Sequence, residues 1–320
     1  MNKVLISISS FAENDDQAIK ILEANNIEII QNTENKKLSE DKLIELIKDC
    51  DAVIAGTEKI SQKVIDAGKK LKIIARVGIG VNNIDLFAAK RKKIKVSYTP
   101  EVPAPYLAEM TIGIMLTMLR HVHISNLNMH KGVWSRIFGR SITNSTIGII
   151  GYGRVGQNIT NKIKSLKPKK ILIYDISNEI KTNDELIEFS ALKKIYTECD
   201  IISLHLPLNT STYNLITKEN LLEMKSDAII INNSRGGIIN EQDLYEVLKS
   251  GHLSGAAIDV FEDEPYNGNL KEIDNCLLTG HMGSMSIECR NEMEVQAVND
   301  VIRAMKNEEL KNEIPEYVNK

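Results

Sequence analysis

Short apolar runs alternate with amphipathic segments along the chain. Runs rich in β-branched residues, such as KVLISIS at 3–9, DAVIAG at 51–56 and KIIARVG at 72–78, are typical of buried strands. Between them, QAIKILEANN and EDKLIELIKDC repeat apolar residues at helical spacing. This alternation predicts βα units, and therefore a parallel sheet covered by helices, over residues 1 to about 100.

A second series of the same kind follows a proline-rich stretch. TPEVPAP at 99–105 resists both helix and central strand, so it predicts a linker or hinge. Residues 106–130 form one long helical pattern, whose first half is apolar almost all round and therefore buried against another surface. Strand-like runs then recur between TIGIIG at 146–151 and NCLLTG at 275–280. The whole pattern predicts two α/β domains, each with a doubly wound parallel sheet.

The composition is that of a globular protein with a substantial core. Hydrophobic residues make up 42% and charged residues 26% of a 320-residue chain, which fits two ordinary folded domains. The net charge of −3 arises from 40 basic and 43 acidic residues spread along the chain, so the chain has no basic footprint for DNA or RNA. We therefore expect a small-molecule partner and no nucleic acid.

Membrane, secreted and metal-binding classes are also not expected. Apolar runs are broken by glycine or charge well short of the ~20 residues of a membrane span. The N-terminus lacks the long apolar stretch of a signal peptide, which predicts a cytoplasmic protein. The cysteines at positions 50, 199, 276 and 289 form no CxxC pair, which predicts neither a zinc site nor a disulfide framework.

A glycine motif indicates a dinucleotide. Gly151, Gly153 and Gly156 form GxGxxG between the strand-like TIGII and the helical QNITNKIKSL. These glycines permit a tight turn, close approach of the main chain to a pyrophosphate, and close packing of helix on strand. Asp175 ends the next strand-like run, where it would accept hydrogen bonds from the adenosine ribose and repel a 2′-phosphate. The combination predicts NAD rather than NADP, whereas Asp175 alone also fits a solvated charge at a strand end.

Three side chains suit hydride transfer between a 2-hydroxy acid and a 2-oxo acid. That reaction requires a cation to hold and polarise the oxo acid and a proton donor for the forming alkoxide. Arg235 and His281 follow strand-like runs, and Glu264, in EDEP after GAAIDVF, would orient His281 and stabilise its protonated form. Arg235 also fits a structural ion pair and His281 a loop position. His205, at another strand end, is by itself more often structural.

Ordered motifs over nearly the whole chain resemble those of the D-isomer-specific 2-hydroxyacid dehydrogenases, most closely the D-3-phosphoglycerate dehydrogenase branch. The motifs that carry the resemblance are ARVGIGVNNIDLFAAK at 75–90, YLAEMTIGIMLTMLR at 106–120, GIIGYGRVG at 148–156, SLHLPLNTST at 203–212, INNSRGGIIN at 231–240, GAAIDVFEDEP at 255–265 and TGHMGS at 279–284. Their order and spacing are far more specific than one GxGxxG.

The resemblance implies roles for individual residues. It implies a catalytic set of Arg235, Glu264 and His281, and an Asp259 that positions the nicotinamide carboxamide, although Asp259 also fits a simple strand end. The residues implied to border the cofactor are Gly151, Gly153, Arg154, Val155, Gly156, Asp175, Pro207, Thr212, Asn233, Ser234, Arg235, Asp259, His281 and Gly283. The residues implied to bind the substrate carboxylate, largely through the main chain, are Arg76, Val77, Gly78 and Gly80.

The family's arrangement also implies how the domains are divided. Residues 101–285 would form a Rossmann-type NAD-binding domain, and residues 1–100 together with 286–320 a flavodoxin-like substrate-binding domain. The long helix after the prolines commonly serves dimerisation in this family, and its apolar surface predicts a homodimer.

Three features depart from the family pattern. Gly280 precedes His281 where the family usually has proline, which predicts a less rigid loop. The strand end AGT at 55–57 lacks an arginine that several phosphoglycerate enzymes have there for the phosphate. Arg76, Arg136 and Arg140 are the alternative phosphate contacts, or simply solvated residues. The chain also leaves no room for a C-terminal regulatory domain, so feedback by serine is not expected.

Two classes of function remain open at this stage. The first is an NAD-dependent enzyme, D-3-phosphoglycerate dehydrogenase or a relative that acts on glycerate, on glyoxylate or hydroxypyruvate, or on a lactate-type acid. The second is a non-catalytic NAD-sensing protein, because transcriptional corepressors of this family use NAD to control assembly. Turnover of any 2-oxo acid separates the two.

Overall fold

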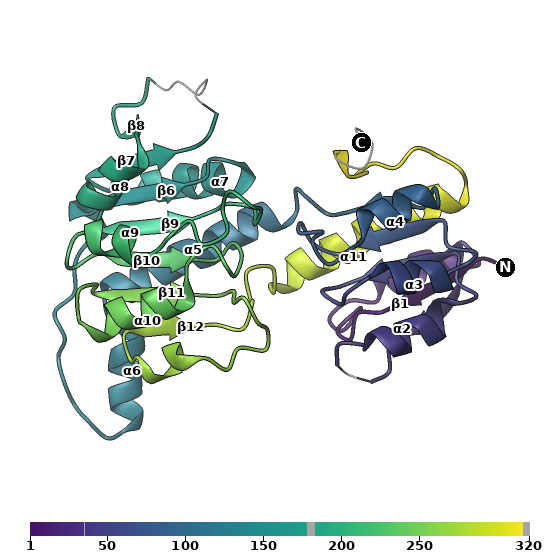
Figure 1. The fold of residues 1–320 in the computed structure, drawn as a ribbon, viewed down its shortest axis with the longest axis horizontal. Coiled ribbons are helices and arrows are strands. Elements are labelled where there is room, and N and C mark those ends of the chain that lie inside the picture. Colours follow the sequence, from purple (N-terminus) through teal and green to yellow (C-terminus); the bar gives the residue numbers. More distant parts are fainter. Residues whose placement is uncertain (35, 178–182, 316–320) are drawn as a thin grey trace. The chain divides into compact units, whose positions relative to one another are not determined.

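The computed structural model describes residues 1–34, 36–177 and 183–315. The chain divides into two compact units. Unit 1 comprises Met1–Pro103 and Ser284–Lys320, and unit 2 comprises Ala104–Gly283. Each has a parallel sheet with helices on both faces (Figure 1). The last five residues of the segment predicted at 286–320 lie outside the described residues.

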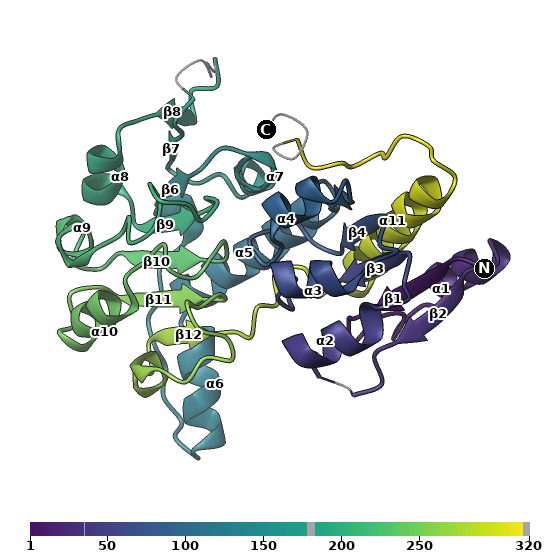
Figure 2. The same ribbon diagram turned by 45° about the vertical axis from the view of Figure 1, so that its right-hand side comes forward.

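Unit 1 is built on a sheet with the strand order β2-β1-β3-β4-β5, which is the flavodoxin-like order. Its strands are β1 (Lys3–Ile6), β2 (Glu28–Gln31), β3 (Ala52–Ala55), β4 (Ile73–Arg76) and β5 (Lys95–Ser97). One face is covered by α2 (Glu40–Ile47), α3 (Gln62–Ala67) and α4 (Leu86–Arg91), and the other by α1 (Gln17–Ala24) and α11 (Ile287–Met305) (Figure 2).

Local sequence explains these elements. Every residue of β3 is buried, as expected for a central strand of a sheet covered on both faces. Helix α2 begins after Ser39, whose side chain accepts a hydrogen bond from the Lys42 amide, and its Leu43 and Ile47 are fully buried against the sheet. Burial of one such side chain contributes roughly 1.5–3 kcal/mol, so the apolar stripe of α2 is sufficient to fix which face meets the sheet.

The C-terminal segment completes unit 1. Helix α11 lies beside α1 and packs on β3 and β4. The chain then returns along β5, where the Tyr98 amide donates to Asn312 O over 3.1 Å and the Ile314 amide to Val96 O over 3.2 Å. These contacts bring residues from the two ends of the sequence together in unit 1.

Unit 2 is built on a sheet with the strand order β12-β11-β10-β9-β6-β7-β8, in which the direction of strand addition reverses between β6 and β9. Its strands are β6 (Thr146–Ile150), β7 (Lys170–Tyr174), β8 (Ile187–Phe189), β9 (Ile201–Leu204), β10 (Ile229–Asn232), β11 (Gly255–Ile258) and β12 (Cys276–Leu278). The order β8-β7-β6-β9-β10-β11 is that of a Rossmann fold. The predicted fold class is therefore confirmed for both sheets.

The helices of unit 2 form two layers. Helices α8 (Leu192–Glu198), α9 (Lys218–Glu223) and α10 (Glu241–Lys249) cover one face, and α5 (Pro103–Leu119) and α7 (Arg154–Ile163) the other (Figure 2). Helix α6 (Val122–His130) continues from the end of α5, and the short 3-10 helices are η1 (Ile142–Asn144), η2 (Lys164–Leu166) and η3 (Asn269–Glu272). Separate apolar clusters fill the two sides of the sheet, as a doubly wound fold requires.

The prediction of one helix over 106–130 is wrong. Helix α5 ends at Leu119, and His121, with φ of 52°, precedes α6. A left-handed residue cannot continue a right-handed helix, so the pattern is divided there. The linker predicted at 99–105 is also shorter than expected, because α5 begins at Pro103 and proline is well tolerated in a first helical turn.

Within the described residues, no helix is long and apolar enough to cross a membrane, and no cluster of three or more His, Cys, Asp or Glu side chains could hold a metal ion. All four cysteines are buried free thiols. Burial raises the pKa of the Cys50 thiol to about 11, which keeps it in the unreactive protonated form.

Candidate active site

The glycine motif forms the turn between β6 and α7. Gly151 has φ of 99°, and a Cβ there would lie 2.3 Å from His205 O, so only glycine fits. A Cβ on Gly156 would lie 2.1 Å from Gly151 O, which explains how α7 packs so closely on β6. A Cβ on Gly153 would meet nothing within 4 Å, so the exposed side of this turn is open to a ligand. Arg154 and Val155 begin α7, where main-chain amides have no acceptor within the helix.

Asp175 is joined to that turn. It follows β7, and its Oδ2 accepts a hydrogen bond from the Tyr152 amide at 2.6 Å, while Oδ1 accepts one from the Ser177 amide at 2.9 Å. Each carboxylate oxygen can accept a second bond, and the side chain is only half buried. The carboxylate is therefore fixed beside the glycine turn and remains able to bind a ribose.

Two buried polar atoms at the carboxyl edge of the unit 2 sheet have no hydrogen-bond partner among the described residues: Asn233 Oδ1 and His205 Nδ1. Leaving such an atom unbonded costs roughly 1–3 kcal/mol. The His205 Nε2 lies 2.8 Å from Ser203 Oγ, and burial lowers the pKa of His205 to about 3, so the ring is neutral. The orphaned atoms, the open side of Gly153 and Asp175 together fit a dinucleotide along this edge.

The loop after β9 is braced by Thr212. Its hydroxyl donates to Pro207 O over 2.6 Å and accepts the Asn209 amide at 2.8 Å. Pro207 is exposed and Thr212 is half-buried. The structure thus places them in one loop at the carboxyl edge, and the hydroxyl of Thr212 shapes that loop.

His281, Glu264 and Arg235 are brought together by loops after β12, β11 and β10. His281 Nδ1 lies 2.9 Å from Glu264 Oε2 and 3.1 Å from Oε1. An ionised carboxylate can only accept, so Nδ1 carries the proton and Nε2 is left to exchange one with a ligand. The two side chains are 40% and 35% exposed, and therefore accessible.

Arg235 interacts electrostatically with Glu264. Burial lowers the pKa of the Arg235 guanidinium and the Glu264 carboxylate opposes that shift, so the side chain stays cationic. Arg235 Nη1 donates to Ser234 O. The site therefore combines a cation, a proton-exchanging nitrogen and an orienting carboxylate.

Asp259 holds the loop that carries His281. It is 1% exposed, and its carboxylate accepts bonds from the Thr279 hydroxyl at 2.6 Å, the Met282 amide at 2.7 Å and the Gly283 amide at 3.0 Å. The His281 amide donates to Asp259 O over 2.8 Å. These four bonds anchor the loop, so the looser loop expected from Gly280 is not what the structure has. Asp259 positions His281 here, a task that its residue type alone did not indicate.

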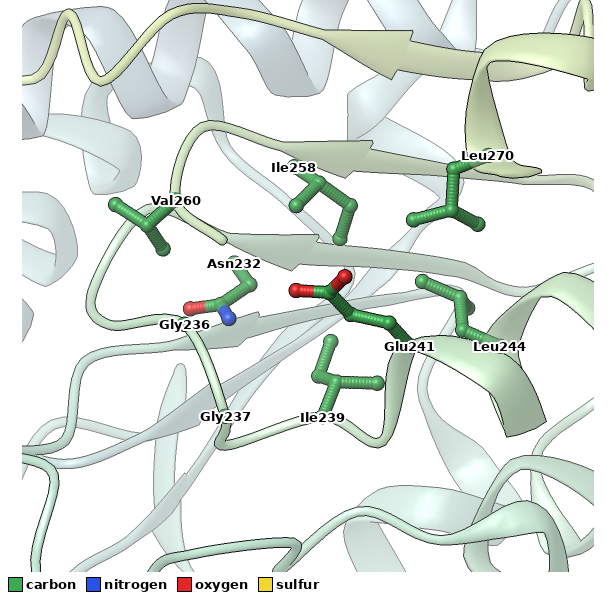
Figure 3. A pocket seen from close by; sticks show the side chains of 9 residues that line it. All are labelled: Asn232, Gly236, Gly237, Ile239, Glu241, Leu244, Ile258, Val260 and Leu270. Carbon is green, nitrogen blue, oxygen red and sulfur yellow. The ribbon is translucent and has the colours of Figure 1, made fainter. Parts of the chain in front are cut away.

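Asn232 and Glu241 are functional supports that the sequence analysis missed. Asn232 Oδ1 accepts bonds from the Ser234 amide and hydroxyl, and its Nδ2 donates to Arg235 O over 2.9 Å, which fixes the turn at 233–235. Glu241 projects into a small apolar pocket beside Asn232, Ile239 and Leu270 (Figure 3).

There its Oε1 accepts the Glu262 amide at 2.8 Å, in the loop that leads to Glu264, and burial raises the pKa of the Glu241 carboxyl. Glu241 opens a helix in the sequence, so only the tertiary structure reveals this role.

The turn at 76–80 of unit 1, which is expected to bind the substrate carboxylate, has only some of its amides available. The Val77 amide donates to Ala55 O over 2.9 Å and the Gly78 amide to Thr99 Oγ1 over 2.8 Å, so neither is available to the expected carboxylate. The amides of Ile79 and Gly80 have no acceptor among the described residues. Arg76 Nε donates to Gly80 O over 3.1 Å, and its guanidinium also contacts Val77 O. The cation therefore lies directly on this turn.

Arg140 is not placed to contact a phosphate at the candidate site of unit 2. Arg140 pairs with Asp227 at 3.0 Å and Asp200 at 3.4 Å, and both aspartates precede strands. It therefore lies at the amino edge of the sheet, opposite to the loops that carry His281. Arg136 is exposed.

Comparisons with known proteins agree with this geometry. A family model described as "D-isomer specific 2-hydroxyacid dehydrogenase, NAD binding domain" matches residues 112–283. The chain belongs to the D-isomer specific 2-hydroxyacid dehydrogenase family. The predicted resemblance and the NAD cofactor are thereby confirmed, and this dehydrogenase acts on hydroxy or oxo acids as its family does.

Relatives of this dehydrogenase have different names. A hydroxypyruvate reductase of Thermotoga maritima is 35% identical over 85% of this chain and 90% of its own length. A D-3-phosphoglycerate dehydrogenase of Methanocaldococcus jannaschii is 34% identical over 93% of this chain, which spans only 57% of that longer protein. The NAD+-bound 3-phosphoglycerate dehydrogenase of Entamoeba histolytica is 30% identical, with a TM-score of 0.81 over 98% of both chains. The chain is thus about equally similar to both kinds of enzyme.

Proposed function

We propose that this dehydrogenase interconverts a small 2-oxo acid and its D-2-hydroxy acid with Arg235, Glu264 and His281 as catalytic residues. One observation supports this proposal above the others. The Glu264 carboxylate occupies His281 Nδ1 at 2.9 Å, so the opposite nitrogen of an accessible imidazole is the group that exchanges a proton.

In the direction of reduction, each residue has one task. Bound NADH supplies the hydride for C2 of the oxo acid. Arg235 holds the 2-oxo acid through its planar guanidinium and polarises the 2-oxo group. His281 donates the Nε2 proton to the oxygen as the C–O double bond becomes a single bond, and Glu264 stabilises the imidazolium before that step. The reverse reaction uses the same groups, with His281 as the base.

We assign substrate binding to unit 1 on the basis of its turn at 76–80. The amides of Ile79 and Gly80, which have no acceptor among the described residues, and the Arg76 guanidinium lie together there at the end of β4. Ligands of open parallel sheets bind outside the carboxyl ends of the strands, which is where this turn lies. In this proposal residues 1–100 and 286–320 form the substrate-binding domain and residues 101–285 the NAD-binding domain.

Two kinds of substrate are considered. D-3-phosphoglycerate is suggested by the similarity of sequence motifs, and we rank it second. An unphosphorylated acid, such as glycerate or the product of glyoxylate or hydroxypyruvate reduction, is favoured by a specific observation: Arg140 is held at the amino edge of unit 2, and the segment 55–57 offers no cation.

A turnover assay tests the proposal. NADH oxidation is followed with glyoxylate, hydroxypyruvate, pyruvate and 3-phosphohydroxypyruvate, and with NADPH in place of NADH. We expect turnover of at least one acid with NADH. NADH binding without turnover of any 2-oxo acid would instead identify an NAD-sensing protein.

We also propose a homodimer formed through α6 and the segment that follows it. Exposed apolar side chains occur at the end of α5, on α6 and in the segment that follows it: Leu116, Val122, Leu127, Met129, Val133, Trp134, Ile137 and Phe138. A hollow of about 690 Å³ lies beside them, lined in part by Leu116, Arg120 and Met129. Patches of this kind usually mark protein interfaces.

Most of α5 is instead covered by its own sheet, so the interface proposed here differs from the one expected at 106–120. Light scattering at micromolar concentration should give twice the mass of the chain, and Val122→Asp should halve it. The cytoplasmic location stays a prediction from the N-terminal sequence.

A further inference from the structure

A buried carboxylate lies at the substrate edge of unit 1. Strands β1, β3 and β4 are neighbours in the sheet, so the segments that follow them, at Ser7, at 56–58 and at 77–80, lie side by side. Neighbouring strands are about 5 Å apart, so these segments border the same few ångströms of the edge. Glu58 is 3% exposed and Ser7 is 1% exposed.

The surrounding residues hold this carboxylate in place. Glu58 Oε1 accepts the Gly56 amide at 2.7 Å and is also bonded to the Ser7 hydroxyl. A Cβ on residue 56 would lie 2.9 Å from Glu58 Oε2, so glycine there leaves the space that the carboxylate occupies. Oε2 itself has no hydrogen-bond donor among the described residues. One oxygen is therefore anchored, and the other can accept a bond from a ligand.

This carboxylate is tied to the turn assigned to substrate binding. Asn83 Nδ2 donates to Gly56 O over 3.1 Å and to Glu58 O over 2.6 Å, and Asn83 follows closely on the turn at 76–80. The Val77 amide donates to Ala55 O, at the end of β3. The two loops therefore keep a fixed mutual position, with the Arg76 guanidinium on one and the Glu58 carboxylate on the other.

Charges at this edge have opposite signs at the two loops. The loop after β4 carries Arg76, which suits the carboxylate of a 2-oxo acid. The loop after β3 carries Glu58, which is buried, and Lys59, which is exposed and makes no bond to Glu58 among the described residues. A phosphate dianion beside Glu58 would meet a like charge that solvent does not screen, because the group is buried.

We propose that Glu58 is a specificity-determining residue that accepts a hydrogen bond from an uncharged hydroxyl at the distal end of the substrate and excludes a phosphate there. The substrate class is then a 2-oxo monocarboxylate with a distal hydroxyl group. This inference rests on the proposed function, because it takes the turn at 76–80 as the binding site of the substrate carboxylate.

Steady-state kinetics with three acids tests the role of the charge. Glyoxylate has no distal group, hydroxypyruvate has a hydroxyl and 3-phosphohydroxypyruvate has a phosphate. For the wild type we expect kcat/KM for hydroxypyruvate to exceed that for the phosphorylated acid by at least about tenfold, the size of one unfavourable charge contact. Glu58→Gln keeps an oxygen for the Gly56 amide and removes the charge. It should raise kcat/KM for the phosphorylated acid at least about tenfold relative to glyoxylate.

Two control variants separate charge from packing. Ser7→Ala disturbs the same contact but keeps the charge, so it should leave the ratio of phosphorylated acid to glyoxylate unchanged. Asp51→Asn removes a charge from the opposite end of β3, where Asp51 pairs with Lys72, and should also leave the ratio unchanged. A ratio that stays within about twofold of wild type in Glu58→Gln, or that rises equally in all three variants, overturns the proposal.

Calorimetry keeps the inference testable if turnover or folding fails. Titration of the NAD-saturated wild type with D-glycerate and D-3-phosphoglycerate should show at least about tenfold tighter binding of D-glycerate. Tighter binding of D-3-phosphoglycerate overturns the role of Glu58. Binding of D-glycerate without turnover of any oxo acid would instead refute the catalytic roles in unit 2 and leave the role of Glu58 standing.

Discussion

The two edges of the unit 2 sheet use a buried aspartate in opposite ways. At the amino edge, Asp200 precedes β9 and pairs with Lys225 and Arg140, while its Oδ2 accepts the Thr146 amide at 2.7 Å. At the carboxyl edge, Asp259 follows β11 and has only uncharged donors, all from the loop that carries His281. The first aspartate joins strands and cations into a closed network. The second leaves the nearby cation and imidazole available to a ligand.

This contrast separates stability from activity within one domain. At the amino edge Asp200 is bonded to two cations and a main-chain amide, whereas the described part of the carboxyl edge keeps two buried atoms without a partner and a half-exposed His281. An edge that binds a ligand retains polar atoms without hydrogen-bond partners in the protein, and these atoms lower its stability. Mutations at the carboxyl edge should therefore lower activity, whereas mutations at the amino edge should lower the free energy of unfolding.

The largest effect is expected for His281→Ala. Loss of the proton donor should lower kcat by roughly 10²- to 10⁴-fold, while the dissociation constant for NADH stays within about twofold. Stopped-flow and fluorescence titration measure the two quantities. His252→Ala is the matched control, because His252 bonds Met224 O in the same unit away from the site, and it should retain turnover. Near wild-type turnover in His281→Ala would show that another group moves the proton.

Asp200→Asn should lower stability and leave activity unchanged. The substitution leaves the half-buried Lys225 and Arg140 without their shared carboxylate and weakens the bond from the Thr146 amide, so the free energy of unfolding should fall by roughly 1.5–3 kcal/mol with kcat unchanged. Asp227→Asn removes the exposed partner of the same arginine and should cost at most about 1 kcal/mol. Urea unfolding monitors both variants. Equal losses would mean that burial of Asp200 is irrelevant.

His205 should make the carboxyl edge sensitive to acid. Its pKa is lowered by burial to about 3, whereas the unfolded chain protonates histidine near ~6.5. The stabilising contribution is therefore complete above that unfolded value and is lost as the pH falls toward 3, by about 1.4 kcal/mol per pH unit, or about 2 kcal/mol by pH 5.

The variant His205→Gln, which does not titrate, should flatten this part of the curve of unfolding free energy against pH. The exposed His130→Gln should leave it unchanged, and a wild-type slope in His205→Gln would contradict the assignment.

The smallest effect is expected for Asp175→Ala. The ribose loses an acceptor and a 2′-phosphate loses a repelling charge, so preference for NADH over NADPH should fall by roughly tenfold, or about 1.4 kcal/mol. Titration of both cofactors measures it. Wild-type protein that prefers NADPH would remove the basis for this role of Asp175.

Features that depend on a single property of one residue type could be predicted from the sequence. The glycines at 151 and 156 were recognisable because no Cβ fits there, and the alternation of strands and helices predicted both sheets. Pairing of His281 with Glu264 was also expected, because the chemistry requires it, and the structure places them 2.9 Å apart.

Features that depend on contacts with residues distant in sequence could not be predicted. The break at His121 lies in a pattern that is helical on both sides, and no local signal marks its left-handed φ. The amides of Val77 and Gly78 were expected to be free, but Ala55 and Thr99, distant in sequence, take them. The same limit hid Glu241 and Glu58, which are ordinary charges until the fold buries them.

Because the C-terminal segment packs in unit 1, we expect the two units to complete their folding in a defined order during synthesis. A ribosome releases residues 104–283 before α11, so unit 2 has all its strands while the sheet of unit 1 still lacks the helix that covers β3 and β4. We therefore expect the usual N-terminal-first order to be reversed, with contacts such as that of Ala12 with Glu294, 282 residues apart, closing long loops last. During synthesis, the uncovered face of unit 1 is where we expect chaperones to bind.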